Sequence, residues 1–158
     1  MQPRLTIELV PSSCWYSNVR SNVRPQTWDQ LQDEYFAAAH HKCEICGGRG
    51  PHHPVELHEI WAYDDHRCIQ RLSHLATLCP RCHQVKHIGL AIAKQNAQSA
   101  IEWLAHVNQW TDHQAVAYVL QCIEEHKIRS QFNWTLDLQL LQTKHRIQLT
   151  RSGIEAGL

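Results

Sequence analysis

The chain has no charge excess and no long apolar run. Lysine and arginine number 15, the same as aspartate and glutamate, so the 158 residues carry no net charge at neutral pH. A positive field over the whole surface, of the kind that attracts nucleic acid indiscriminately, is therefore excluded. No stretch approaches the roughly 20 apolar residues of a membrane span, and the first ten residues lack the uninterrupted apolar run of a signal peptide. We expect no association with a membrane.

Glycine and proline are also scarce, at six residues each, and no repeat or low-complexity stretch occurs. These absences exclude a fibrous or disordered protein and favour a soluble globular one. The seven cysteines are an odd number. Three of them, Cys14, Cys68 and Cys122, have no metal-like spacing, and as spare thiols they argue against a disulfide scaffold and indicate a reducing cytoplasm.

The other four cysteines form two pairs, Cys43-x-x-Cys46 and Cys79-x-x-Cys82. This spacing suits four-thiolate coordination, so we predict one structural Zn²⁺ at these residues. Gly47 provides the permissive backbone that a knuckle around a metal needs. His53, which lies near the first pair, is a weaker candidate zinc ligand.

The segment between the two pairs predicts a second metal site. Residues 55–61 and 75–78 read as short strands, and Pro80 and Gly89 suit the start and end of a helix. His83 and His87 are four residues apart, so both would project from one face of that helix. With His58 on the first strand they would offer three nitrogen ligands, a number typical of catalytic rather than structural metals.

Residues 42–89 resemble the HNH endonucleases with their ββα-metal fold. The resemblance rests on three stretches of sequence: Cys43-Glu-Ile-Cys-Gly47, Glu56-Leu-His-Glu-Ile60 and Leu75-Ala-Thr-Leu-Cys-Pro-Arg-Cys-His-Gln-Val-Lys-His87. It implies a metal-dependent hydrolase that cleaves phosphodiester bonds in DNA. It also implies that His58, His83 and His87 hold Mg²⁺ or another divalent cation. The family's general-base histidine is replaced by Glu59, and its central asparagine by His74.

These two substitutions leave alternatives open. Glu59 could act as the base, helped or replaced by His74, or it could be a fourth ligand that closes the site. The chain is then either an active endonuclease, with Glu59, His74 and His83 as catalytic residues, or a catalytically impaired module. Such a module would bind nucleic acid or assemble with a protein partner or a second copy, as a subunit of a phage or defence complex.

Positive charge is concentrated in the same part of the chain. Residues 42–94 contain seven Lys/Arg and five Asp/Glu, together with seven histidines. We therefore expect a short contact with nucleic acid centred here. The candidate phosphate-binding residues are Arg67, Arg71, Arg81 and Lys86, with solvated side chains as the alternative.

The flanking regions predict helices and two further strands. Residues 5–10 and 134–140 alternate with period two, so we expect both in one small terminal sheet. Capping patterns at Thr27 and Thr111 predict helices over 27–39 and within 97–129. The tryptophans outside the central segment are interpreted as core anchors. The expected fold class is α+β: an N-terminal strand and helix (1–41), a zinc-stabilised ββα-metal core (42–89), and helices with a strand that pack on it (90–158).

Overall fold

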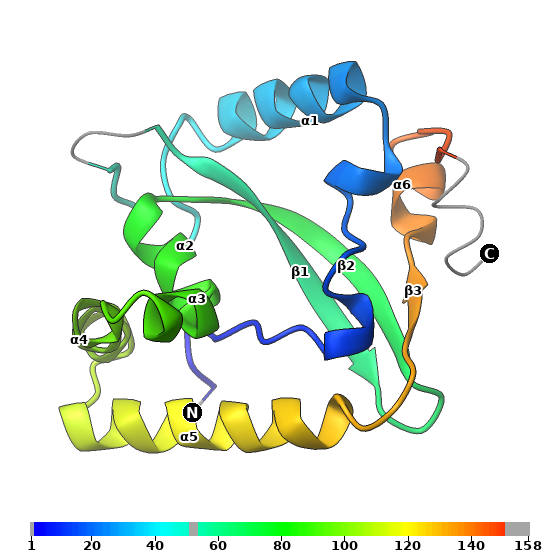
Figure 1. Ribbon diagram of the computed structural model, residues 1–158. Coiled ribbons are helices and arrows are strands. Elements are labelled where there is room, and N and C mark those ends of the chain that lie inside the picture. Colours follow the sequence, from blue (N-terminus) through cyan, green and yellow to red (C-terminus); the bar gives the residue numbers. More distant parts are fainter. Residues whose placement is uncertain (1, 51–53, 151–158) are drawn as a thin grey trace.

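Figure 1 shows the computed structural model, which describes residues 2–50 and 54–150. The α+β class is confirmed. The elements, in order, are η1 (Ser12–Cys14), η2 (Arg20–Asn22), α1 (Pro25–Ala38), β1 (Glu56–Asp64), β2 (Ile69–Leu78), α2 (Pro80–Lys86), α3 (Ile88–Ala93), α4 (Ala97–Asn108), α5 (Asp112–Arg129), β3 (Thr135–Asp137) and α6 (Gln139–Thr143).

A long twisted hairpin forms the centre of the fold. β1 and β2 pair antiparallel from Glu56 opposite Leu78 to Asp64 opposite Ile69, with a register shift at Ile60/Trp61. β3 adds to the far side of β2 as a parallel strand, so the order is β1-β2-β3 and β1 is an edge. The N-terminal segment runs past this hairpin before it reaches α1 (Figure 1).

The predicted terminal sheet is wrong. Residues 5–10 form no strand, and β3 pairs with β2 instead. Leu5 and Ile7 are buried because the segment packs on the helical core. Its backbone binds groups outside any ladder: Glu8 N donates to Lys86 O (3.0 Å), and the Asn108 side chain accepts from Leu5 N and donates to Leu5 O. The period-two alternation of residues 5–10 thus indicates that one side of the segment is buried, and it does not indicate that the segment pairs as a strand.

The predicted helices are present with shifted ends. Thr111 and Gln114 form the capping box of α5. α1 begins at Pro25, two residues earlier than predicted, because proline fits the first helical turn. The helix expected to reach Gly89 ends at Lys86, because His87 leaves helical geometry (φ −98°, ψ 43°) and α3 begins at Ile88.

The hairpin separates two hydrophobic clusters. One cluster is built from α2 to α5, the residues around Leu5 and the end of β2. The other contains α1, α6 and the opposite side of the hairpin. Trp28 and Trp134 are buried core anchors as predicted, but Trp15 is 60% exposed, so the core interpretation is wrong for that residue. Among the described residues, no helix has the length and apolar character needed to cross a membrane.

Candidate metal centres and the adjoining cavity

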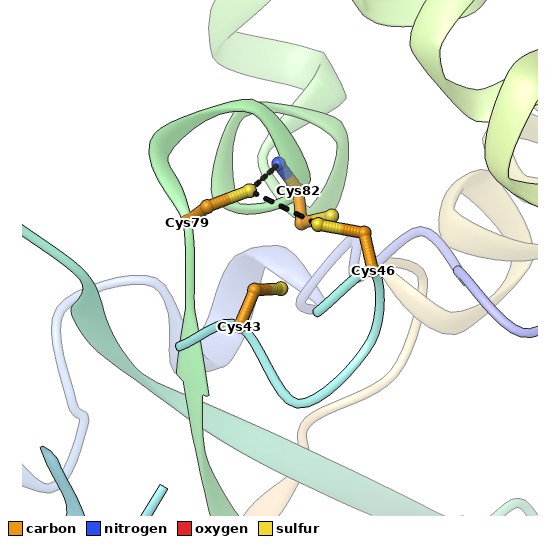
Figure 2. A group of neighbouring side chains, drawn as sticks. All are labelled: Cys43, Cys46, Cys79 and Cys82. Atoms are coloured by element: carbon orange, nitrogen blue, oxygen red, sulfur yellow. Dashed lines mark hydrogen bonds between the residues drawn. The ribbon is translucent and has the colours of Figure 1, made fainter. Parts of the chain in front are cut away.

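The four paired cysteines come together as the sequence predicted. Their sulfur atoms lie within 4.8 Å of one another. Figure 2 shows Cys43 and Cys46 on the loop before β1 and Cys79 and Cys82 at the start of α2. Gly47, which follows Cys46 directly, has φ +76°, the left-handed backbone expected in a knuckle. This group can hold a metal ion such as zinc. His53, the weaker candidate, lies outside the described residues.

Hydrogen-bond donors surround the cysteine sulfurs. Cys82 N donates to Cys79 Sγ (3.5 Å), Gly48 N to Cys46 Sγ (3.4 Å) and Trp103 Nε1 to Cys82 Sγ (3.3 Å). Hydrogen bonds from the neighbouring Cys79 and Cys82 thiols hold the pKa of Cys43 well below its usual range. The same contacts raise the pKa of Cys79 and Cys82, because one thiolate is stabilised by its protonated neighbours. The N–H donors stabilise sulfur in the thiolate form, which is the form that binds metal.

The three predicted histidines also meet at one point. One ring nitrogen from each of His58, His83 and His87 lies within 4.8 Å of the others. The Nε2 atoms of His83 and His87 are 3.0 Å apart. Two nitrogens that bind one ion at ~2.1 Å and at a right angle lie ~3.0 Å apart, so this separation suits a shared cation.

His58 provides the test of whether an ion fits. Its side chain is 2% exposed, and neither ring nitrogen has a hydrogen-bond partner. Burial, followed by the nearby His87 and His83, lowers its pKa to about 2, so the ring is neutral. A buried neutral imidazole with no partner has the state that a metal ligand requires. The three histidines therefore fit a divalent cation.

Glu56 orients the cluster, and the sequence analysis missed this role. Its Oε2 lies 2.9 Å from His83 Nδ1. A proton on Nδ1 leaves the Nε2 lone pair facing the other histidines, as in the carboxylate–histidine pairs of known metal sites. The signal was present in the sequence, because Glu56 is two residues before His58 and so shares its face of β1.

Glu59 and His74 are not brought together. Glu59 lies opposite Leu75 and His74 opposite Ile60, so by strand alternation their side chains leave opposite faces of the hairpin. Glu59 Oε1 accepts from Val19 N (3.2 Å), and burial raises the pKa of Glu59. The structure groups the three histidines without Glu59, which disfavours the alternative of a fourth ligand.

The candidate phosphate contacts differ in their surroundings. Arg81 is exposed and stacks on the Trp103 ring, 3.8 Å from its centroid. Arg71 pairs with Asp137 (2.9 Å), and Arg67 lies in the exposed turn of the hairpin. Both are remote from the histidines: the four residues from His58 to Ala62, which pairs with Arg71, span roughly 13 Å.

Lys86 does not have the surroundings of a phosphate contact. Its side chain is buried, Nζ donates to Thr6 Oγ1 (2.6 Å), and Nζ lies 3.7 Å from Glu8 Oε1. These contacts tie the N-terminal segment to α2. The burial of Lys86 contradicts a direct contact between this residue and a nucleic-acid backbone.

A cavity of about 540 Å³ adjoins the histidine cluster. It lies between the N-terminal segment, the β1 edge, α3 and α5. His58, Glu59 and His87 line it, together with Glu8 and Gln70. One side of the candidate cation site therefore faces a space large enough for part of a substrate.

Comparisons with protein-family models, curated proteins and solved structures give no match for this chain.

Proposed function

We propose that the protein is a metal-dependent endonuclease of the HNH type that hydrolyses phosphodiester bonds in DNA. The observation that carries the proposal is the convergence of His58, His83 and His87 at the meeting point of a hairpin and a short helix. The order of these residues also resembles that of the cation ligands in the HNH motif, although Glu59 and His74 replace the base histidine and the central asparagine of that motif. Three ligands beside an open cavity suit a catalytic cation better than a structural one.

Each residue of the site would have a separate role in the reaction. His58, His83 and His87 would hold the cation, with Glu56 fixing the orientation of His83. When bound, a divalent cation polarises the scissile phosphate and stabilises the leaving 3′-oxygen. Glu59 would accept a proton from the attacking water, for which its place in the adjoining cavity is suitable. Arg81, exposed on α2, would contact the backbone of the strand.

A zinc ion on the four cysteines would give this site its rigidity. Cys79 caps α2 and Cys82 lies in its first turn, while His83 and His87 lie on and just after the same helix. Zinc would therefore fix the helix that supplies two of the three cation ligands. Rigid placement matters, because catalytic geometry tolerates displacements of only about 0.5 Å.

The test is cleavage of supercoiled plasmid by the zinc-loaded protein with added Mg²⁺, Mn²⁺ or Ni²⁺. We expect nicked or linear DNA with the native chain and none with His83→Ala. His113→Ala, which changes an exposed histidine on α5, serves as the matched control and should cut normally. A native protein that binds the cation but leaves the plasmid intact under all three metals contradicts the proposal.

A catalytically impaired module is the second candidate. The observation that favours it is the separation of Glu59 from His74, which leaves the substituted base without the orienting partner that the motif usually has. In that case DNA would bind without being cut, and His83→Ala would leave DNA affinity unchanged. A gel-shift assay run beside the cleavage assay separates the two candidates.

A further inference from the structure

The cavity beside the histidines contains a side chain that the proposed reaction does not use. Gln70, on the central strand β2, is 0% exposed and lines the cavity. Neither its amide oxygen nor its amide nitrogen has a hydrogen-bond partner. An unpaired buried amide destabilises a fold, whereas an apolar residue of similar size would not. A ligand that offers both a donor and an acceptor would satisfy Gln70, so its unpaired amide indicates a binding site.

Away from the histidine cluster, the cavity has no side chain suited to a phosphate among its described residues. Among the described residues that line it, none is lysine or arginine, whereas Glu8 and Glu59 both contribute carboxylates. Glu8 is already engaged, since it pairs with Lys86. A ligand here should therefore be neutral and should carry hydrogen-bond donors for the remaining acceptors.

The walls of the cavity suit a flat ring. Trp15 and Trp61 both line it, and Trp15 remains 60% exposed although an apolar core lies close by. The Trp15 ring lies parallel to that of His126, at an interplanar angle of 6° and a centroid distance of 6.3 Å. Exposed indole faces are the surfaces on which single-stranded nucleic acids stack their bases. The shape of the cavity, its lack of lysine and arginine and its aromatic walls thus all favour a heteroaromatic ligand.

We propose that this cavity binds an unstacked nucleobase, and that the Gln70 amide recognises the donor and the acceptor on its edge. The presence of a nucleic-acid strand at this place rests on the proposed function. A glutamine amide pairs with adenine through one donor and one acceptor. An unpaired cytosine offers the same combination through N4–H and N3, and an unpaired thymine offers it through N3–H and O4.

The position of the base along the strand follows from the sheet register. Gln70 pairs with Tyr63, five residues after His58 on β1. That interval is roughly 16 Å between backbone positions at ~3.3 Å per residue, so Gln70 and His58 lie toward different ends of the cavity. The recognised base therefore belongs to a nucleotide neighbouring the scissile phosphate, and it determines which bond is presented to the histidines.

The test measures binding, not cleavage. Fluorescein-labelled single-stranded hexamers of deoxyadenosine, deoxycytidine, deoxythymidine and an abasic deoxyribose phosphate are titrated with zinc-loaded protein by fluorescence anisotropy. No Mg²⁺, Mn²⁺ or Ni²⁺ is added, so the strand is not cut. We expect the three base-containing hexamers to bind roughly tenfold more tightly than the abasic hexamer, a base preference on the scale of one good side-chain–base pair.

Variants at position 70 decide the assignment. Gln70→Leu should fold normally, because it removes an unpaired polar group, and should abolish the base preference without changing the affinity for the abasic hexamer. Gln70→Asn, which keeps the amide but shortens its reach, should also lose the preference. Gln30→Leu, on the exposed surface of α1, is the matched control. Thermal unfolding of each variant verifies its fold.

Several outcomes would overturn the proposal. It fails if no hexamer binds, if the native protein shows no base preference, or if the preference survives in a folded Gln70→Leu variant. The proposal also fails if Gln70→Leu weakens the binding of all four hexamers equally, because an equal loss indicates an effect on contacts with the sugar-phosphate backbone. A protein that cuts plasmid but shows no base preference keeps the proposed function and loses this site. A protein that shows the base preference but does not cut plasmid keeps this site and loses the proposed function.

Discussion

The cysteine cluster and the histidine cluster share one short helix but differ in almost every physical respect. Cys43, Cys79 and Cys82 are buried within the hydrophobic core, and backbone and indole N–H groups donate to the sulfurs. In the histidine cluster only His58 is buried, and His87 is exposed. Four soft ligands in a closed shell suit a metal that stabilises a fold, whereas three nitrogens beside a cavity suit a metal that meets a substrate.

The difference shows how α2 separates stability from chemistry. Cys82 and His83 are neighbours in sequence, and one helical step of about 100° directs them to different partners. Cys82 packs into the core beside Trp103, while His83 faces the β1 strand through Glu56. A mutation in the histidine site should therefore leave the zinc in place, whereas loss of the zinc should also impair the histidine site.

The largest expected effect comes from removing a cysteine ligand. Cys82→Ser should lose zinc and the cooperative unfolding transition, because zinc binding in small metal domains contributes about 10–16 kcal/mol. Whole domains are stable by only about 5–15 kcal/mol. Zinc content by elemental analysis and thermal unfolding by circular dichroism measure this. Cys68→Ser, a thiol outside the cluster, should retain both. A Cys82→Ser protein that unfolds cooperatively without zinc would show that the metal is dispensable.

Removing a histidine ligand should have a large effect on the cation and little on the fold. We expect His87→Ala to lower the affinity for Mn²⁺ by more than the roughly 10–100-fold typical of an outer-sphere partner. Zinc content and thermal unfolding should stay close to native, because His87 is exposed. Isothermal titration calorimetry with Mn²⁺ provides the measurement, with His113→Ala as the control. Loss of zinc from His87→Ala would contradict the expectation that the cysteine site does not depend on the histidine site.

Both clusters could be predicted from sequence because their spacing is local. The pairs Cys43–Cys46 and Cys79–Cys82, and the interval from His83 to His87, specify geometry over one turn of chain. Two meetings needed long-range contact: that of His58 with the helix, which the antiparallel hairpin supplied, and that of the first cysteine pair with the second. The order of these residues is the one on which the resemblance to HNH endonucleases rests.

Other features depended on contacts that no local pattern encodes. Lys86 looked like a helix-surface residue, but Thr6 and Glu8, about 80 positions away in the chain, bury it. The same segment alternates like a strand yet packs on helices, since alternation reports which side is buried and not which partner covers it. Gln70 gave no sequence signal at all, because its unpaired state follows from the tertiary fold.

A smaller effect is expected when the substituted base is neutralised. Glu59→Gln should keep Mn²⁺ affinity and lower plasmid cleavage by roughly 10²–10⁴-fold, the usual contribution of a positioned base. The amide oxygen can still accept from Val19 N, so the fold should be preserved. Weaker Mn²⁺ binding would instead identify Glu59 as a ligand. If Glu59→Gln leaves the rate unchanged while His74→Ala abolishes cleavage, the base is His74.

The smallest expected effect tests the carboxylate behind the histidine cluster. Glu56→Gln removes a charge but keeps an oxygen that can accept from His83 Nδ1, so Mn²⁺ affinity should fall by only about tenfold. Glu56→Ala removes the acceptor as well and should approach a 100-fold loss. Both variants should fold normally, because the Glu56 side chain is 49% exposed. Calorimetric titration of these variants, with the exposed Glu34→Gln as a control, separates orientation from charge. Native affinity in both would mean that the His83–Glu56 contact is a surface ion pair with no bearing on the metal.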